Sequence, residues 1–317
     1  MKPEAFAQPN RQPSHSKTLL ISGASGLIGT AVTAAARKKG HEVRHLVRRS
    51  PAAAYEFSFA PERGEVDERA FEGVDAVINL SGASISKMPW TTRYKELLVR
   101  SRLDATNTIV AAINRMDVPP AQLLSGSAVG IYGSHSSDAP LDESASGTGF
   151  LADLCRQWED AALAAEPTTS VTLLRTGLVL STNGGMLPVV SRITKLGGAG
   201  RLGSGRQHWP WISLGDYTAA LMHLTGLESR SSSAIPGPVN LCVPEAATEE
   251  EFMRTLASVL HRPYLLPAPA FALKLLLGDA ANELLLANQP AVPKRLLNAG
   301  FRFTDVNLRG LLQRELG

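Results

Sequence analysis

Three glycines follow one another at intervals of three residues near the start of the chain, at Gly23, Gly26 and Gly29. They come directly after an apolar run and lead into a helical pattern. In such a segment the first glycine permits a tight turn, the second lets the backbone approach a pyrophosphate, and the third lets the helix pack closely. Free amides at the helix start then face the phosphates. The spacing predicts a dinucleotide site, in which the neighbouring residues Ser25, Leu27 and Ile28 are further contacts.

The end of the second expected strand, about 20 residues past the glycines, predicts which dinucleotide is bound. Sites that prefer NAD carry an acidic residue there, whereas this chain has Arg48 and Arg49. A carboxylate would repel a 2′-phosphate, but a guanidinium forms charge-assisted bonds to it. We therefore expect NADP(H) as the cofactor. The alternative is a solvated pair of surface arginines that happens to follow a strand.

The elements that must position these residues are a series of short apolar runs that alternate with longer helical patterns, which is typical of a parallel sheet covered by helices. The expected strands are Thr18 to Ser22, Glu42 to Val47, Ala76 to Leu80, Gln122 to Ser125 and Val171 to Thr176. The expected helices are Leu27 to Lys39, Thr91 to Arg115 and Phe150 to Ala165. This order predicts an α/β fold, a Rossmann-like doubly wound parallel sheet with a smaller, mostly helical C-terminal lobe.

The 317 residues leave room for one large domain or two smaller ones. Residues 1–17 mix polar residues and proline without an apolar run, and we expect a disordered leader there. Residues 18–180 are predicted to form the NADP-binding Rossmann domain, to which residues 211–242 return. Residues 181–210 and 243–317 are predicted to form the smaller C-terminal substrate lobe.

The composition excludes several classes of protein. With 44% hydrophobic and 19% charged residues the chain is predicted to fold, and a net charge of +3 is too small to indicate a nucleic acid or an anionic membrane as partner. The two cysteines, Cys155 and Cys242, form neither a disulfide framework nor a paired metal site. We expect a cytoplasmic protein with a small-molecule substrate, no metal and no membrane span. The sequence leaves the oligomeric state open, with a homodimer as one option.

Taken together, these residues resemble the extended short-chain dehydrogenases/reductases, and more narrowly an atypical NAD(P)-dependent epimerase-like family with its own C-terminal domain. Besides the glycine turn, the matches are Asn79–Ile85, Trp90, Ser101-Arg102, Ser127–Gly130, Tyr132-Gly133, Arg175–Leu180, Gly203–Gln207, Trp211-Ile212, Asp216, Arg262-Pro263, Pro293–Arg295 and Gly300–Phe303. The matches in the last part of the chain have no general structural reason to recur in that order, so they are specific to the narrower family.

The resemblance implies further cofactor contacts beyond the glycine turn. It implies that Leu80, Ser81 and Gly82 lie against the adenosine-ribose side of the cofactor, that Arg102 contacts the cofactor, and that Val179 lies near the nicotinamide. A structural Arg102 that caps a strand or pairs with a carboxylate is the alternative.

The resemblance also raises a question about catalysis. Enzymes of this superfamily use a serine and a Tyr-x-x-x-Lys pair, in which the lysine stabilises a phenolate whose ordinary pKa is about 10. Ser127 matches the serine, but the expected pair reads Phe150 to Leu154, or Leu151 to Cys155 one residue along. The narrower family shares this departure. Tyr132, the tyrosine nearest in sequence to Ser127, is the candidate substitute acid.

Three functional accounts stay open at this point, and we favour an enzyme. The first account is an NADP-dependent oxidoreductase that uses Ser127 and Tyr132. The second is a sugar-nucleotide epimerase or dehydratase relative whose acid comes from the second lobe, and the third is a non-catalytic NADP(H)-binding sensor or scaffold. The segment Gly203–Trp211 resembles a loop that lines the substrate cleft, where Arg206, Gln207 and His208 would hold a polar substrate. In that segment Trp209 and Trp211 either stack on the substrate or anchor the core.

Overall fold

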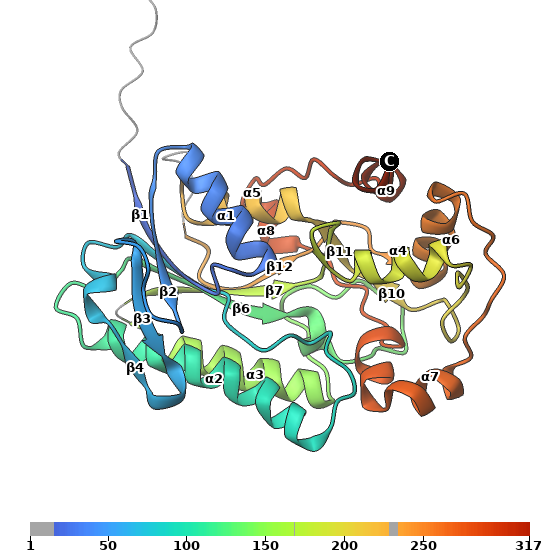
Figure 1. Cartoon of the computed structure of the whole chain (residues 1–317), viewed down its shortest axis with the longest axis horizontal. Helices are drawn as coiled ribbons and strands as arrows, with labels where there is room; N and C mark the ends of the chain where they lie inside the picture. Colours follow the sequence, from blue (N-terminus) through green and yellow to red (C-terminus); the bar gives the residue numbers. More distant parts are fainter. Residues whose placement is uncertain (1–15, 168, 228–233) are drawn as a thin grey trace, which may run out of the picture.

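The structure is a computed structural model that describes residues 16–167, 169–227 and 234–317. An eight-stranded sheet runs through its centre, with helices on both faces (Figure 1). Almost all of the predicted leader lies outside the described residues.

The sheet has the strand order β12-β7-β6-β5-β1-β2-β3-β4, and every neighbouring pair is parallel except β3 and β4. Its strands are β1 (Thr18–Ser22), β2 (Glu42–Val47), β3 (Glu56–Ala60), β4 (Glu65–Val66), β5 (Ala76–Asn79), β6 (Gln122–Ala128), β7 (Ser170–Thr176) and β12 (Gly237–Leu241). The order reverses at β1, where β5 lies on one side and β2 on the other. In a doubly wound sheet a cleft opens at such a point, beyond the carboxyl ends of the strands.

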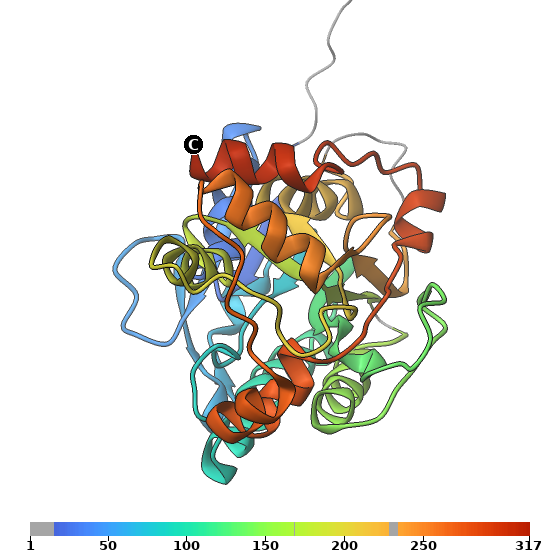
Figure 2. The same ribbon diagram turned by 90° about the vertical axis from the view of Figure 1, so that its right-hand side faces the viewer.

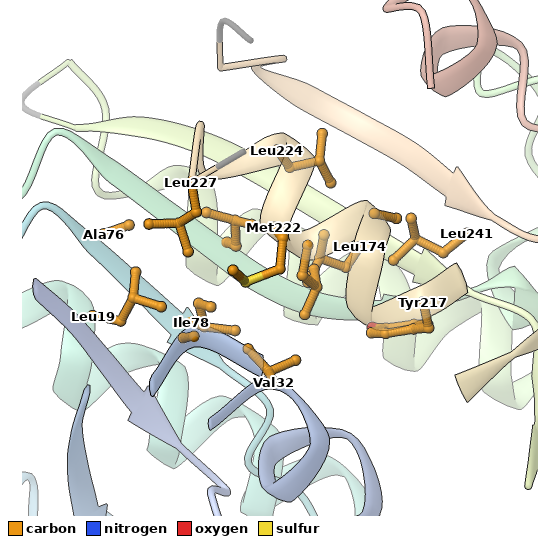
Figure 3. Close-up of a cluster of buried hydrophobic side chains, with 14 of the residues drawn as sticks. Leu19, Val32, Ala76, Ile78, Leu174, Tyr217, Met222, Leu224, Leu227 and Leu241 are labelled. Carbon is orange, nitrogen blue, oxygen red and sulfur yellow. The ribbon is translucent and has the colours of Figure 1, made fainter. Parts of the chain in front are cut away.

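Helices α1 (Leu27–Lys38) and α5 (Leu214–Leu224) cover one face of the sheet, and α2 (Thr92–Asn114) and α3 (Phe150–Leu163) cover the other (Figure 1). Figure 3 shows the core on the first face, where Val32 of α1 and Met222 of α5 pack over Ile78 of β5. The second face packs Ile109 and Ile113 of α2 against the central strands. Because both faces are covered, the central strands are buried along nearly their whole length rather than at alternate residues.

The C-terminal lobe lies beyond one end of the sheet and is mainly helical (Figures 1 and 2). Its helices are α4 (Leu187–Lys195), α6 (Glu249–Val259), α7 (Ala270–Leu277), the π-helix η4 (Ala281–Leu285) and α9 (Leu308–Leu316), whereas α8 (Lys294–Asn298) packs on β12 of the main sheet. Two small sheets accompany them, formed by β8 (Leu178–Ser181), β9 (Gly184–Gly185) and β11 (Trp211–Ser213), and by β10 (His208–Trp209) and β13 (Ala247–Thr248). The predicted Rossmann-like fold with a helical C-terminal lobe is confirmed.

Several elements differ from the expectation or were not expected. The edge strands β3 and β4 and the returning strand β12 were not predicted individually, although β12 lies within the segment expected to rejoin the first domain. Strand β6 extends to Ala128, so Ser127 lies inside the strand rather than just after it. Four short 3-10 and π-helical turns complete the described chain: η1 (Pro61–Arg63), η2 (Glu68–Phe71), η3 (Val129–Tyr132) and η4.

Candidate dinucleotide-binding site

The glycine turn joins β1 to α1, and two of its glycines are required by close contacts. Gly23 has φ 74°, and a Cβ there would lie 2.7 Å from the carbonyl oxygen of Leu80. A Cβ on Gly29 would lie 2.4 Å from the carbonyl oxygen of Gly23, so only glycine lets the helix start this close to the turn. The Gly26 amide donates to the Gly23 carbonyl at 3.0 Å and closes the turn.

A cavity of about 680 Å³ opens over this turn, a size typical of small-molecule and cofactor sites. It lies where β1, β2 and β5 end, and one face of α2 forms its far wall. Of the residues predicted to contact the cofactor, eight line it: Gly23, Ser25, Gly26, Arg48, Arg49, Leu80, Ser81 and Gly82. The structure therefore brings the glycine turn, the arginine pair and the end of β5 together around one space.

The two arginines after β2 differ in their surroundings. Arg49 forms two bonds to the Glu56 carboxylate, of 2.8 and 2.5 Å, and these bonds, with one from the Ala52 amide, lower the pKa of Glu56 to about 2. Arg48 is exposed at the cavity and has no hydrogen bond or ion pair with any described residue. Arg48 is thus the guanidinium that is free to bind an added anion, while Arg49 holds β3 against the end of β2.

Five predicted contact residues do not line this cavity. Leu27 packs on the β9 glycine Gly184, Ile28 packs against the core, and Gly29 lies under the turn. Val179 lies in β8 and pairs with Ile212 of β11. The fifth is Arg102. The cavity covers only the region around β1, β2, β5 and α2. Backbone contacts of Leu27, Ile28 and Gly29 with the cofactor, and the contact of Val179 with the nicotinamide, therefore stay predictions.

Arg102 is buried behind the wall of the cavity. Its stem passes under Gly82, where a Cβ would lie 3.2 Å from the arginine Cγ, and its guanidinium lies 5.1 Å from the ring of Trp158. It donates to the Leu98 carbonyl at 2.9 Å and has no carboxylate partner among the described residues. Burial lowers the pKa of Arg102. A buried guanidinium with so few partners has hydrogen-bonding capacity left over next to Gly82.

The residues of α2 that form the far wall were missed by sequence reasoning. They are Leu97, Arg100, Ser101, Asp104 and Ala105. Their spacing of three and four residues identifies one face of a helix, which is a signal the sequence contains. The sequence does not say which structure that face meets, because the contact with the glycine turn comes from the tertiary fold.

The two predicted catalytic hydroxyls, those of Ser127 and Tyr132, lie in a buried network behind the strand ends. The Ser127 hydroxyl donates to Glu159 at 2.6 Å, and Glu159 forms two bonds of 2.9 Å to Arg175. Arg175 donates to the Tyr132 hydroxyl at 3.2 Å, and that hydroxyl donates to the side chain of Asn240 at 2.6 Å. Every member of this network is buried.

The electrostatics of the network oppose proton exchange with a bound substrate. Burial raises the pKa of Tyr132 to about 12, although Arg175 acts in the opposite direction. Burial alone would lower the pKa of Arg175, but its bonds to Glu159 raise it. A phenol that stays protonated, is fully buried and already donates to an amide is a poor general acid. The catalytic roles of Ser127 and Tyr132 stay predictions, and their geometry favours a structural role.

The start of α3, where the usual tyrosine would stand, is apolar and closed by the C-terminal lobe. Glu283 of η4 accepts from the amides of Phe150 and Leu151 at 3.0 and 3.2 Å and so caps the helix. The Phe150 ring packs edge-on against Trp90, and Lys95 lies over the same ring at 5.2 Å. No group at this position can take the part of a catalytic phenol.

The loop expected to hold a polar substrate uses its polar groups internally. The Gln207 amide donates to the carbonyls of Leu202 and Leu285, and His208 contacts Asn288 through its backbone amide and its ring. Trp209 and Trp211 are buried in the core of the C-terminal lobe, so they anchor the core as the second of the two sequence-based alternatives expected. Only Arg206 of the expected trio is left without such a side-chain bond among the described residues.

No group of three or more His, Cys, Asp or Glu residues in the described part of the chain could hold a metal ion. No helix within residues 16–167, 169–227 and 234–317 is long and apolar enough to cross a membrane.

The fold and the cavity define a Rossmann-like dinucleotide-binding protein of the extended type, in which a second lobe closes over the carboxyl ends of the strands. Residues 19–242 match the model of the NAD dependent epimerase/dehydratase family, and residues 268–315 match a domain of unknown function, DUF1731. The chain belongs to the NAD dependent epimerase/dehydratase family.

Similar proteins cover nearly the whole chain. The epimerase family protein Mb2239 of Mycobacterium bovis is 43% identical over 285 residues, which are 89% of this chain and 92% of the relative. A crystal structure of the human epimerase family protein SDR39U1 with NADPH has a TM-score of 0.83 and 28% identity, and covers 94% of this chain and 98% of that one. A nucleoside-diphosphate sugar epimerase from Corynebacterium glutamicum has a TM-score of 0.76 and 29% identity; the match covers 95% of this chain and 58% of that one.

Proposed function

We propose that this protein binds NADP(H) in the cavity over the glycine turn and uses it in oxidoreductase or epimerase-type chemistry on a small molecule. The observation that carries this proposal is the exposed Arg48, which has no hydrogen bond or ion pair with any described residue and lies at the rim of a cavity lined by Gly23–Gly26 of the glycine turn. NADPH in the similar human structure supports the same cofactor.

The residues present fit the cofactor. Gly23, Gly26 and Gly82 line the cavity, and amides at the start of α1 would face the phosphates of a bound dinucleotide. Arg48 would bind the 2′-phosphate, and Leu80 and Ser81 would lie against the adenosine ribose. When bound, this cofactor supplies or accepts a hydride.

Arg102 is proposed to contact the cofactor from behind Gly82, because its guanidinium is buried there and the Leu98 carbonyl is its single hydrogen-bond partner within the part of the chain that the structure describes. The conservative variant Arg102→Lys tests this. It keeps the charge but loses the planar fork, so we expect weaker NADPH binding with the same unfolding temperature within a few degrees. Unchanged affinity in a folded Arg102→Lys protein would remove Arg102 from the site.

Turnover is tested by incubating the protein with NADPH or NADP⁺ and a panel of nucleotide sugars, aldehydes and ketones while following the absorbance of the reduced nicotinamide. Turnover that is lost in Ser127→Ala, with NADPH affinity and folding intact, would support catalysis through this serine. Turnover that persists in Ser127→Ala would support an enzyme whose proton donor lies elsewhere.

A second candidate function, a non-catalytic NADP(H)-binding sensor or scaffold, is favoured by one specific observation. Both predicted catalytic hydroxyls are buried and bonded to other side chains. This candidate predicts tight NADPH binding with no absorbance change on any member of the panel. Turnover on a single panel member would exclude it.

A further inference from the structure

One part of the cavity over the glycine turn is left without a role by the contacts proposed so far. The turn, Arg48 and the end of β5 would hold the phosphates, the 2′-phosphate and the adenosine ribose. Other lining residues lie on β3, on the turn η1 and on α2, among them Phe59, Pro61, Glu62, Arg100, Asp104 and Ala105. Because the base of a dinucleotide is joined to the same ribose, this part of the cavity is the space left for the base.

The fold gives this space apolar walls. Phe59 of β3 and Ala105 of α2 both line the cavity and are otherwise buried. The turn η1 packs on α2, where the Thr108 hydroxyl lies 3.5 Å from the Pro61 carbonyl oxygen (Figure 1). A ligand pocket of this kind holds a ring between apolar surfaces and orients it with a few polar groups. The polar groups at this end of the cavity therefore decide which base fits.

Several polar side chains of the cavity are already used within the protein. The Ser101 hydroxyl accepts from the Ala83 amide at 2.9 Å, and Arg49 and Glu56 are bonded to each other. Four charged side chains at the cavity have no hydrogen bond or ion pair with any described residue; they are Arg48, Glu62, Arg100 and Asp104. Two carboxylates thus remain available to a ligand beside the apolar walls.

Asp104 is the better placed of these two carboxylates. It is half-buried on the long helix α2, directly before the buried wall residue Ala105. Arg100 lies four residues earlier on the same face, a spacing that permits an ion pair, yet the two side chains are not paired. Glu62 is exposed and belongs to a three-residue turn. The Asp104 carboxylate is therefore the more firmly positioned acceptor at this end of the cavity.

A carboxylate at the edge of a base distinguishes adenine from hypoxanthine. An ionised carboxylate only accepts hydrogen bonds, and the exocyclic amino group of adenine only donates them. Hypoxanthine carries a carbonyl oxygen in place of that amino group, so two acceptors would face each other. A hydrogen bond to a charged group changes affinity by about tenfold or more.

We propose that Asp104 selects the adenine base of the dinucleotide, with its carboxylate accepting a hydrogen bond from the adenine amino group. The proposal rests on the proposed NADP(H) binding and adds to it a specificity-determining residue on α2. A carboxylate that bound the ribose, or that only supported the helix, would affect adenine and hypoxanthine nucleotides alike. The ratio of the two affinities therefore isolates contact with the base.

The test compares NADPH with reduced nicotinamide hypoxanthine dinucleotide phosphate, titrated by the fluorescence of the reduced nicotinamide. The unmodified protein should bind NADPH about tenfold more tightly or better. In Asp104→Asn the side-chain amide can donate to the hypoxanthine carbonyl, so this ratio should fall to about twofold or less. Loss of a negative charge near the phosphates acts on both nucleotides equally and cancels in the ratio. Equal affinities in the unmodified protein, or an unchanged ratio in folded Asp104→Asn, would overturn the proposal.

Two matched variants serve as controls. Glu96→Gln removes an exposed carboxylate from the same helix outside the cavity lining, and Glu62→Gln removes the other carboxylate at the cavity. Each should leave the ratio within about twofold of the unmodified protein. If Glu62→Gln removes the preference for adenine and Asp104→Asn does not, the assignment to Asp104 is wrong. The comparison on the unmodified protein needs no variant, so it stands whether or not Asp104→Asn folds.

NADH and its hypoxanthine counterpart, measured on the same preparations, separate this proposal from the proposed function. Tighter binding of NADPH than of NADH without any preference between the bases would overturn the role of Asp104 alone. A preference for adenine that is lost in Asp104→Asn, together with equal binding of NADPH and NADH, would overturn the proposed NADP(H) preference alone.

Discussion

Substituting Arg48 changes the one side chain that distinguishes NADPH from NADH in this account. Bonds to a charged partner contribute about 1.5–3 kcal/mol, and because Arg48 is exposed we take the lower end, which is about tenfold in affinity. Arg48→Ala should therefore weaken NADPH binding about tenfold and leave NADH nearly unchanged, since NADH carries a hydroxyl in place of the phosphate.

Arg48→Asp adds repulsion to this loss. Two unit charges about 4 Å apart in water repel by about 1 kcal/mol, and a phosphate carries nearly two charges, so the repulsion adds about 2 kcal/mol and the total loss should reach about 300-fold. Fluorescence titration of NADPH and NADH gives both constants. The control is Arg49→Lys, which keeps the charge and the pairing with Glu56 and should stay within about twofold of the unmodified protein. Equal losses for NADPH and NADH in Arg48→Ala would refute the reasoning.

Three further substitutions test other parts of the structure. Gly29→Ala places a Cβ 2.4 Å from the Gly23 carbonyl oxygen, so we expect a lower unfolding temperature together with loss of NADPH binding. Normal NADPH binding would show that the turn accommodates the added methyl group, which would contradict this expectation. Glu159→Ala leaves Arg175 buried without its carboxylate and should cost about 3–5 kcal/mol in denaturant unfolding, against about 1 kcal/mol for Ser127→Ala; equal costs would contradict the network. Burial raises the pKa of the Glu249 carboxyl from its ordinary value of 4.5 to about 7 in the folded protein. Between these two pH values the folded protein keeps the proton and the unfolded chain releases it, so the free energy of unfolding falls as the pH rises from 4.5 to about 7. Glu249→Gln should therefore gain in unfolding temperature relative to the unmodified protein from about pH 5 to about pH 8, and a pH-independent difference would count against the shifted carboxyl.

The parts of the fold that could be predicted are those set by local patterns. The strand Thr18–Ser22, the glycine turn and helix α1 were predicted almost to the residue, because apolar periodicity, glycine spacing and a basic helix end all agree there. The same agreement predicted the position of Arg48 at the rim of the cavity. The edge strands β3 and β4 carry no comparable pattern, since they are short and only partly buried.

The parts of the site that could not be predicted depend on long-range contacts. The sequence around Ser127 does not indicate that its hydroxyl donates to the Glu159 carboxylate, because the two residues meet only when α3 packs on β6. The capping of α3 by Glu283 joins residues more than a hundred positions apart. The burial of the Ser191 and Thr194 hydroxyls beside Leu187 on α4 is likewise known only from the tertiary fold, because it depends on which face of the helix meets the rest of the lobe.

The most direct measurement is a comparison of the dissociation constants of NADPH and NADH for the unmodified protein under one set of conditions. An added 2′-phosphate held by Arg48 predicts NADPH binding at least about tenfold tighter than NADH. Equal binding of the two nucleotides, or no binding of either, would contradict the account.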